Sequence, residues 1–176
     1  MINNKKILEL ESLRGLAAPL VVFFHIPKWN PILDINFLHN ADLAVDLFFV
    51  ISGYVIYKSY GTKIFSFKDL FNFLFLRVGR LYPLHILFLI VYVLFELSKY
   101  FVQLKFQIYP NTPVFSSSNF QSFFNHVLLV QTIGVSPLYT PMSYNGAAWS
   151  ISVEFFAYIF FGIIILLMSK MKNLIF

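Results

Sequence analysis

The sequence predicts an all-α protein, a polytopic transmembrane helical bundle of about four to five spans. Of its 176 residues, 59% are hydrophobic and only 12% are charged, whereas soluble domains are roughly 45–50% apolar. The 13 lysines and arginines stand almost entirely between apolar runs, as the positive flanks of membrane spans do. Because these cations form no single stripe, the formal charge of +5 indicates membrane lipid rather than nucleic acid as the partner.

The first half of the chain predicts two spans joined by a polar segment. After a polar leader, the first span covers about residues 13–26. Residues 27–40 are rich in proline and polar residues and are expected to form a loop, and the second span covers about residues 41–57. Asp42 and Asp46 stand four residues apart, so they share one face of that helix.

A strongly basic stretch, residues 58–80, follows the second span. The positive-inside rule places it in the cytoplasm, and the N-terminus, two spans earlier, is expected on the same side. Within the basic stretch, the aromatic-rich residues 65–76 predict an interfacial amphipathic helix. The third span is expected over residues 81–95, followed by an outer polar loop over 96–119.

The last part of the chain leaves two topologies open. Residues 120–139 are apolar in the middle but include Asn125, His126 and Gln131, so they fit either a span or a re-entrant piece. Residues 149–168 form a clean span apart from Glu154. We prefer the topology in which both segments cross the membrane, which puts Lys170 and Lys172 outside. If only residues 149–168 cross, the two lysines lie inside.

Arg14 and His25 are the first candidate functional pair. On a helix, eleven residues rotate by about 1100°, close to three full turns, so the two positions share one face. One interpretation makes Arg14 an interfacial anchor and His25 a hydrogen-bonded interior residue. The other makes His25 a proton-transfer group, since histidine titrates near neutral pH. The intramembrane carboxylates of Asp46 and Glu154 either neutralise Arg14 or orient His25.

Arg77 and Arg80 form a second candidate pair. At a spacing of three they are neighbours on a helix, and they are either an ordinary positive flank or a two-pronged clamp for phosphate. Ser52 with Gly53 permits a close helix approach or a break in the second span. The histidines other than His25 are scattered, and the sequence predicts no metal site.

Four segments together resemble the membrane-bound acyltransferase family 3, whose members O-acetylate bacterial surface polysaccharides. The resemblance covers nearly the whole chain, and the segments follow the family's order. They are Leu13-Arg14-Gly15 through His25, Val45-Asp46-Leu47-Phe48-Phe49-Val50-Ile51-Ser52-Gly53-Tyr54, Arg77-Val78-Gly79-Arg80-Leu81-Tyr82-Pro83-Leu84 and Trp149-Ser150-Ile151-Ser152-Val153-Glu154-Phe155-Phe156.

The resemblance implies a reaction and a set of site residues. An acyl group, most often acetyl, would pass from cytoplasmic acyl-coenzyme A to a hydroxyl of a glycan across a bacterial plasma membrane. His25 would be the catalytic base, which deprotonates the acceptor hydroxyl or transiently relays the acyl group, and Asp46 and Glu154 would complete the catalytic set. The paired arginines would bind the phosphates of coenzyme A. The remaining substrate-binding positions would be Arg14, Ser52 and Trp149.

Family members usually have about twice as many spans, so residues 1–176 are expected to be the N-terminal part of such a domain. The bundle would then be an incomplete version of a larger one, and a second polypeptide could supply the missing spans. Two other functions stay open on the sequence. One is a transporter or proton-conducting subunit lined by the intramembrane charges, and the other is an inactive remnant or the partner half of a split enzyme.

Overall fold

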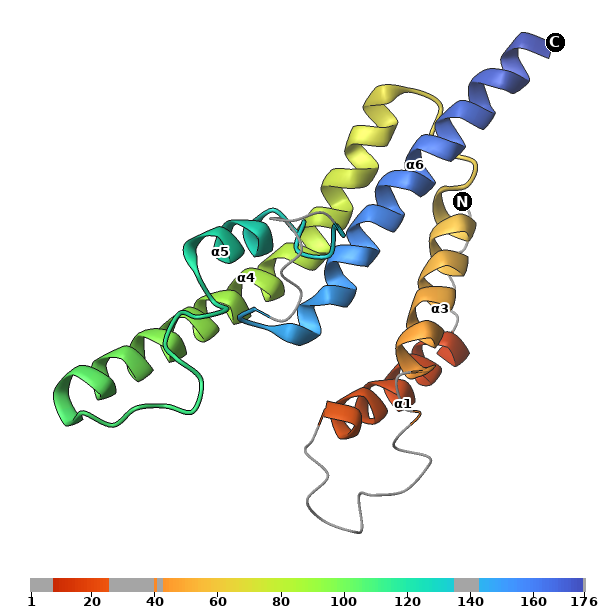
Figure 1. Ribbon diagram of the computed structural model, residues 1–176. Helices are drawn as coiled ribbons and strands as arrows, with labels where there is room; N and C mark the ends of the chain where they lie inside the picture. The colour runs from red at the N-terminus through yellow and green to blue at the C-terminus, as the bar shows by residue number, and fades with distance from the viewer. Residues whose placement is uncertain (1–7, 26–39, 41–42, 135–142, 176) are drawn as a thin grey trace. The chain divides into compact units, whose positions relative to one another are not determined.

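A computed structural model describes residues 8–25, 40, 43–134 and 143–175, and it confirms the predicted all-α fold (Figure 1). The chain divides into two compact units, residues 1–63 and residues 64–176. Among the described residues, 3 helices are long and apolar enough to cross a membrane. The helices are α1 (Leu8–His25) and α3 (Leu43–Tyr60) in the first unit, and α4 (Phe67–Phe106), α5 (Phe120–Val127), the 3-10 turn η1 (Gly146–Ala148) and α6 (Trp149–Ile175) in the second.

The first unit consists of α1 packed against α3. Small and branched side chains are buried on the two helices: Ala17 is 3% exposed, Ala44 6% and Ile51 4%. Helix α3 confirms the second predicted span within a few residues at each end. Helix α1 covers the first predicted span but begins five residues earlier, and it is not one of the 3 described helices that are long and apolar enough to cross a membrane. Helix α3 runs without interruption past Gly53, and a Cβ there would meet no atom of the described residues within 4 Å, so among them this glycine makes neither a break nor a close approach. The predicted loop over 27–40 and Asp42 lie outside the described residues, Asn40 excepted.

Helix α4 is one continuous helix of 40 residues, which joins the predicted interfacial helix over 65–76 to the predicted third span over 81–95 without a break. Its length of about 60 Å is roughly twice the hydrocarbon thickness of a bilayer. A capping box formed by Ser66 and Asp69 starts the helix, and the left-handed conformation of Gln107 ends it. Pro83 forfeits only one backbone hydrogen bond, so the helix continues past it and past the predicted start of the outer loop at residue 96.

Helix α6 runs antiparallel to the first half of α4 (Figure 1). Near the start of α4, the Lys170 ammonium lies 4.6 Å from the ring centroid of Phe67. Nearly two turns further along α4, the Phe73 ring lies 5.7 Å from that of Phe161 and 6.3 Å from that of Tyr158. The order of contacts along α6 is thus the reverse of the order along α4.

This antiparallel pairing corrects the preferred topology of the C-terminal part. The end of α6 with Lys170 lies at the same end of the pair as Lys68, which belongs to the basic stretch. The two-crossing topology had placed these lysines on opposite sides of the membrane. The pairing instead agrees with a single crossing after α4, which keeps both lysines on the positively charged side.

Helix α5 has only 8 residues, about 12 Å, so the predicted span over 120–139 is wrong. Its last carbonyl groups receive hydrogen bonds from outside the helix ladder. The carbonyl of Asn125 accepts from the N–H of Val130 at 2.9 Å, and that of Val127 accepts from the Tyr82 hydroxyl of α4. Irregular backbone at membrane depth requires such partners, because lipid offers none. Residues 120–134 therefore form a hydrogen-bonded wedge beside α4.

Gly162 sets the distance between α4 and α6. A Cβ at this position would lie 2.4 Å from Cδ1 of Leu70 and 3.4 Å from Cδ1 of Phe73. We expect Gly162→Leu to lower the free energy of unfolding by about 1–3 kcal/mol through overpacking, as measured by thermal unfolding in detergent. Gly162→Ala should cost less, because the Leu70 side chain can rotate away.

Gly79→Ala is the matched control for this substitution. In the part of the chain that the structure describes, no atom lies within 4 Å of a Cβ at residue 79, and the position is exposed within a helix. Alanine there should raise stability by about 0.5–1 kcal/mol. If the Gly162→Leu variant had the same melting temperature as the wild type, this result would contradict a close approach of α4 and α6 at Gly162.

Candidate active site

Helix α1 carries Arg14 and His25 on one uninterrupted stretch of 18 residues. The helix continues through Pro19, so the rotation that puts positions 14 and 25 on one face applies to this backbone. The side chains of both residues lie outside the described part of the chain. Their roles as base and as substrate-binding residue therefore stay predictions.

Helix α3 presents its two candidate residues differently. Asp46 lies in the first turn and is exposed, while Ser52, nearly two turns later, is only 7% exposed. Carboxylates are favourable in the first turn of a helix, where the macrodipole is positive. The roles predicted for both residues also stay predictions.

Arg77 lies between α4 and α6 against two aromatic rings. Its guanidinium carbon is 5.4 Å from the ring centroid of Phe73, one turn earlier on the same helix. It is 5.8 Å from the ring centroid of Tyr158 on α6. Arginine over an aromatic face gains cation–π attraction, about 2 kcal/mol or more where water is excluded. The aromatic pair thus fixes the position of a half-buried guanidinium between two helices.

Arg80 has different surroundings, although it lies only three residues further along α4. Its side chain is exposed, whereas that of Arg77 is half-buried. The prediction treated the two arginines as equal prongs of one phosphate clamp. The structure instead gives one arginine a fixed place against aromatic rings and leaves the other at the surface of the unit.

Glu154 lies on α6, half-buried, and accepts a hydrogen bond from the hydroxyl of Tyr158. The two residues stand four apart, so they are neighbours on one helix face. Trp149, the other candidate on this helix, is its first residue and is half-buried. Through Tyr158, the segment that carries Glu154 therefore meets the segment that carries Arg77.

A buried polar cluster that the sequence did not predict joins α4 to α5. His85 of α4 is 3% exposed, and its Nε2 donates to the carbonyl oxygen of His126 at 2.8 Å. His126, 0% exposed, stacks on His85 with ring centroids 6.2 Å apart, and its Nε2 lies 3.0 Å from Oγ of Ser143. The histidines are 41 residues apart, so spacing along one helix could not pair them. Their separate positions within apolar stretches were the available signal.

Further hydrogen bonds tie the wedge to the start of α6. Oγ of Ser152 donates to the carbonyl oxygen of Leu129 at 2.6 Å and lies 2.6 Å from Oγ1 of Thr132. The amide nitrogen of Gln131 donates to the carbonyl oxygen of Ala148 at 3.1 Å. The first turn of α6, which begins at Trp149, is thereby held against residues 129–132.

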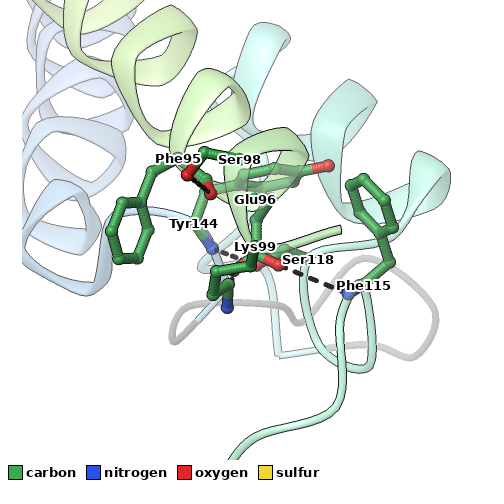
Figure 2. Close-up of polar contacts among 7 residues, drawn as sticks. All are labelled: Phe95, Glu96, Ser98, Lys99, Phe115, Ser118 and Tyr144. Carbon is green, nitrogen blue, oxygen red and sulfur yellow. Dashed lines mark hydrogen bonds and ion pairs between the residues drawn. The ribbon is translucent and has the colours of Figure 1, made fainter. Parts of the chain in front are cut away.

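The far part of α4 holds the loop that leads into α5 (Figure 2). Glu96 forms an ion pair with Lys99 at 2.5 Å and accepts from the backbone N–H of Phe115 at 3.3 Å. The backbone N–H of Tyr144 donates to Oγ of Ser118 at 3.1 Å. Burial, and then the negative charge of Glu96, raise the pKa of the Tyr144 phenol. The phenol hydroxyl donates to the carbonyl oxygen of Asn119.

Comparison with known proteins supports the family that the motif segments resemble. The family model described as an acyltransferase domain matches residues 7–176. "Protein 2 in picA locus" from Rhizobium radiobacter is 37% identical over 82 residues, which cover 44% of this chain and 39% of that protein. The match thus spans about two-fifths of the relative's length. No solved structure is significantly similar to the chain. With a match over all but its first six residues, the chain belongs to the acyltransferase family 3, a family of membrane acyltransferases.

Proposed function

We propose that this protein transfers an acyl group, acetyl in the first instance, from acyl-coenzyme A to a hydroxyl of a cell-surface glycan. The observation that best supports the proposal is the pairing of α4 with α6, which brings Arg77 against Tyr158, the hydrogen-bond partner of Glu154. A cation suited to phosphate and a carboxylate suited to orienting a base then belong to one structural unit.

In the proposed reaction, His25 removes the proton of the acceptor hydroxyl as the oxygen attacks the thioester carbonyl. The acyl–oxygen bond forms, the acyl–sulfur bond breaks, and the coenzyme A thiolate leaves and takes up a proton. A general base contributes typically 10²–10⁴-fold to such a step. Asp46 and Glu154 are the carboxylates available to orient and charge the imidazole.

We place the donor on the side of the basic stretch, which the positive-inside rule assigns to the cytoplasm. Arg80, exposed on α4, is the arginine positioned to meet a soluble phosphate. The acceptor would lie on the other side of a bacterial plasma membrane, reached through a polar path past His25. Arg14, Ser52 and Trp149 are the further residues proposed to line the substrate sites.

The proposal is tested by acyl transfer from labelled acetyl-coenzyme A with the purified chain in nanodiscs. A bacterial polysaccharide with free hydroxyls serves as the acceptor, and label covalently bound to it is the expected product. Hydrolysis without transfer to the polysaccharide would contradict a glycan acceptor. Failure to bind or consume the donor would contradict the acyltransferase reaction itself.

Arg80→Ala should weaken coenzyme A binding about tenfold, because one charge-assisted hydrogen bond contributes roughly 1.5 kcal/mol. Arg77→Ala should weaken it as well and should also lower the melting temperature, since the aromatic contacts of Arg77 are lost. The measurement is binding of a fluorescent coenzyme A analogue to the chain in nanodiscs. Lys105→Ala, at the far end of α4, is the control. A variant with both Arg77→Ala and Arg80→Ala is also measured. If it binds the coenzyme A analogue as tightly as the wild type, neither arginine belongs to the donor site.

A further inference from the structure

Tyr158 occupies the point where the two helices of the candidate site meet. It is 3% exposed and lies four residues after Glu154, on the same helix face. Its ring contacts Phe73 of α4 edge-on, with centroids 6.3 Å apart and an angle of 72° between the ring planes. A large buried tyrosine between two apolar helices could be explained by packing alone, so the two ends of its side chain need separate consideration.

The aromatic ring of Tyr158 contacts the Arg77 guanidinium. The guanidinium carbon lies 5.8 Å from the Tyr158 centroid and 5.4 Å from that of Phe73, so rings from both helices define its position. A phenylalanine at position 158 would supply the same ring. The contact with Arg77 therefore gives no reason for a hydroxyl.

The hydroxyl of Tyr158 is hydrogen-bonded to Glu154. A buried tyrosine O–H needs an acceptor, and here it donates to Oε1 of the Glu154 carboxylate. Hydrogen bonds to an ionised group are about twice as strong as neutral ones and constrain the direction in which the carboxylate points. The ring and the hydroxyl thus act on two different charged residues, one on each helix.

We propose that Tyr158 is a positioning residue that fixes the Glu154 carboxylate relative to the Arg77 guanidinium. The inference rests on the proposed acyl transfer, in which Arg77 contributes to donor binding beside the exposed Arg80 and Glu154 belongs to the catalytic set. Tyr158 itself contacts neither substrate in this account. It holds the two charged groups in one geometry, so that a donor bound through α4 meets a carboxylate that is already oriented on α6.

Two substitutions at position 158 separate the roles of its ring and its hydroxyl. Tyr158→Phe keeps the ring beside Arg77 and removes the bond to Glu154, so kcat for acyl transfer should fall about 10- to 100-fold while the KM for acetyl-coenzyme A stays unchanged. Tyr158→Leu removes both contacts and should raise that KM as well. Tyr92→Phe, a tyrosine of α4 that is 36% exposed, is the control and should behave as the wild type.

An infrared measurement gives a readout that packing alone would not change. In the chain labelled with 13C-glutamate in nanodiscs, the carboxylate band lost in Glu154→Gln identifies Glu154. Tyr158→Phe should shift this band, and Tyr92→Phe should leave it in place. A double-mutant cycle of Tyr158→Phe with Glu154→Gln should be non-additive in kcat, since both changes remove the same interaction.

The possible results test the positioning role of Tyr158 and the proposed acyl transfer separately. An unshifted Glu154 band in Tyr158→Phe would overturn the contact, and an unchanged kcat with an active wild type would overturn the positioning role. Equal loss in kcat from Tyr158→Phe and Glu154→Gln, singly and together, would support it. A wild type that binds no donor and transfers no acyl group would refute the proposed function, and with it the role of Tyr158 in transfer.

Discussion

Replacing His25 with alanine is expected to reduce acyl transfer by about 10²–10⁴-fold, because the acceptor hydroxyl loses the base that takes its proton. Coenzyme A affinity should stay near the wild-type value, since the proposed donor contacts lie on α4. The measurement is the rate of label transfer from acetyl-coenzyme A to polysaccharide in nanodiscs. His39→Ala changes a histidine in the polar segment that precedes Asn40 and serves as the control. Full activity of the His25→Ala variant, with an unchanged melting temperature, would exclude histidine 25 as the base.

Replacing His126 with leucine is expected to lower the free energy of unfolding by about 2–4 kcal/mol. The imidazole is 0% exposed and is hydrogen-bonded through Nε2 to Ser143, with the His85 ring stacked on it at 6.2 Å. Leucine removes the bond to Ser143 and leaves a buried hydroxyl without that partner. The melting temperature in detergent should fall by about 5–10 °C.

Phe124→Leu is the control for this prediction, because Phe124 belongs to the same short helix and is 44% exposed. Its melting temperature should stay within a few degrees of the wild type. A His126→Leu variant as stable as the control would show that the polar cluster does not hold the wedge of residues 120–134 against α4.

Hydropathy was sufficient to predict α3 and α6. Each is an apolar run of the length of a bilayer crossing, with its charged residues few and near its ends. The start and end of α4 could not be predicted in the same way, because Arg77, Arg80 and Pro83 imitate a boundary between two elements. These residues do not interrupt the helix. Arginine has a high helix propensity, and one proline removes one backbone hydrogen bond.

The sequence predicted the short helix α5 as part of a span because the middle of residues 120–139 is apolar. Two side chains of α4 donate hydrogen bonds to the C-terminal end of α5, Tyr82 to the carbonyl of Val127 and His85 to that of His126. These donors lie about 40 residues away in sequence, and no local pattern identifies them. Asn125 and Gln131 within the stretch were the evidence against a lipid-facing helix.

The motif segments single out Arg77, Arg80, Trp149 and Glu154 as candidates on α4 and α6, and the roles of these residues stay predictions. The structure adds an arrangement that the segments did not predict, because Arg77 and Glu154 both contact Tyr158. The difference between Arg77 and Arg80 depends on which rings of α6 face α4. That in turn depends on the close approach at Gly162, which a single sequence does not indicate.

The most direct test of the central claim uses sealed proteoliposomes that enclose a bacterial polysaccharide and receive labelled acetyl-coenzyme A outside. Membrane acyl transfer predicts that the label becomes covalently attached to the enclosed polysaccharide with the wild-type chain and not with His25→Ala. Proton or solute flux without acetyl-coenzyme A, together with an unlabelled polysaccharide and a folded wild-type chain, would contradict the account and indicate a transporter.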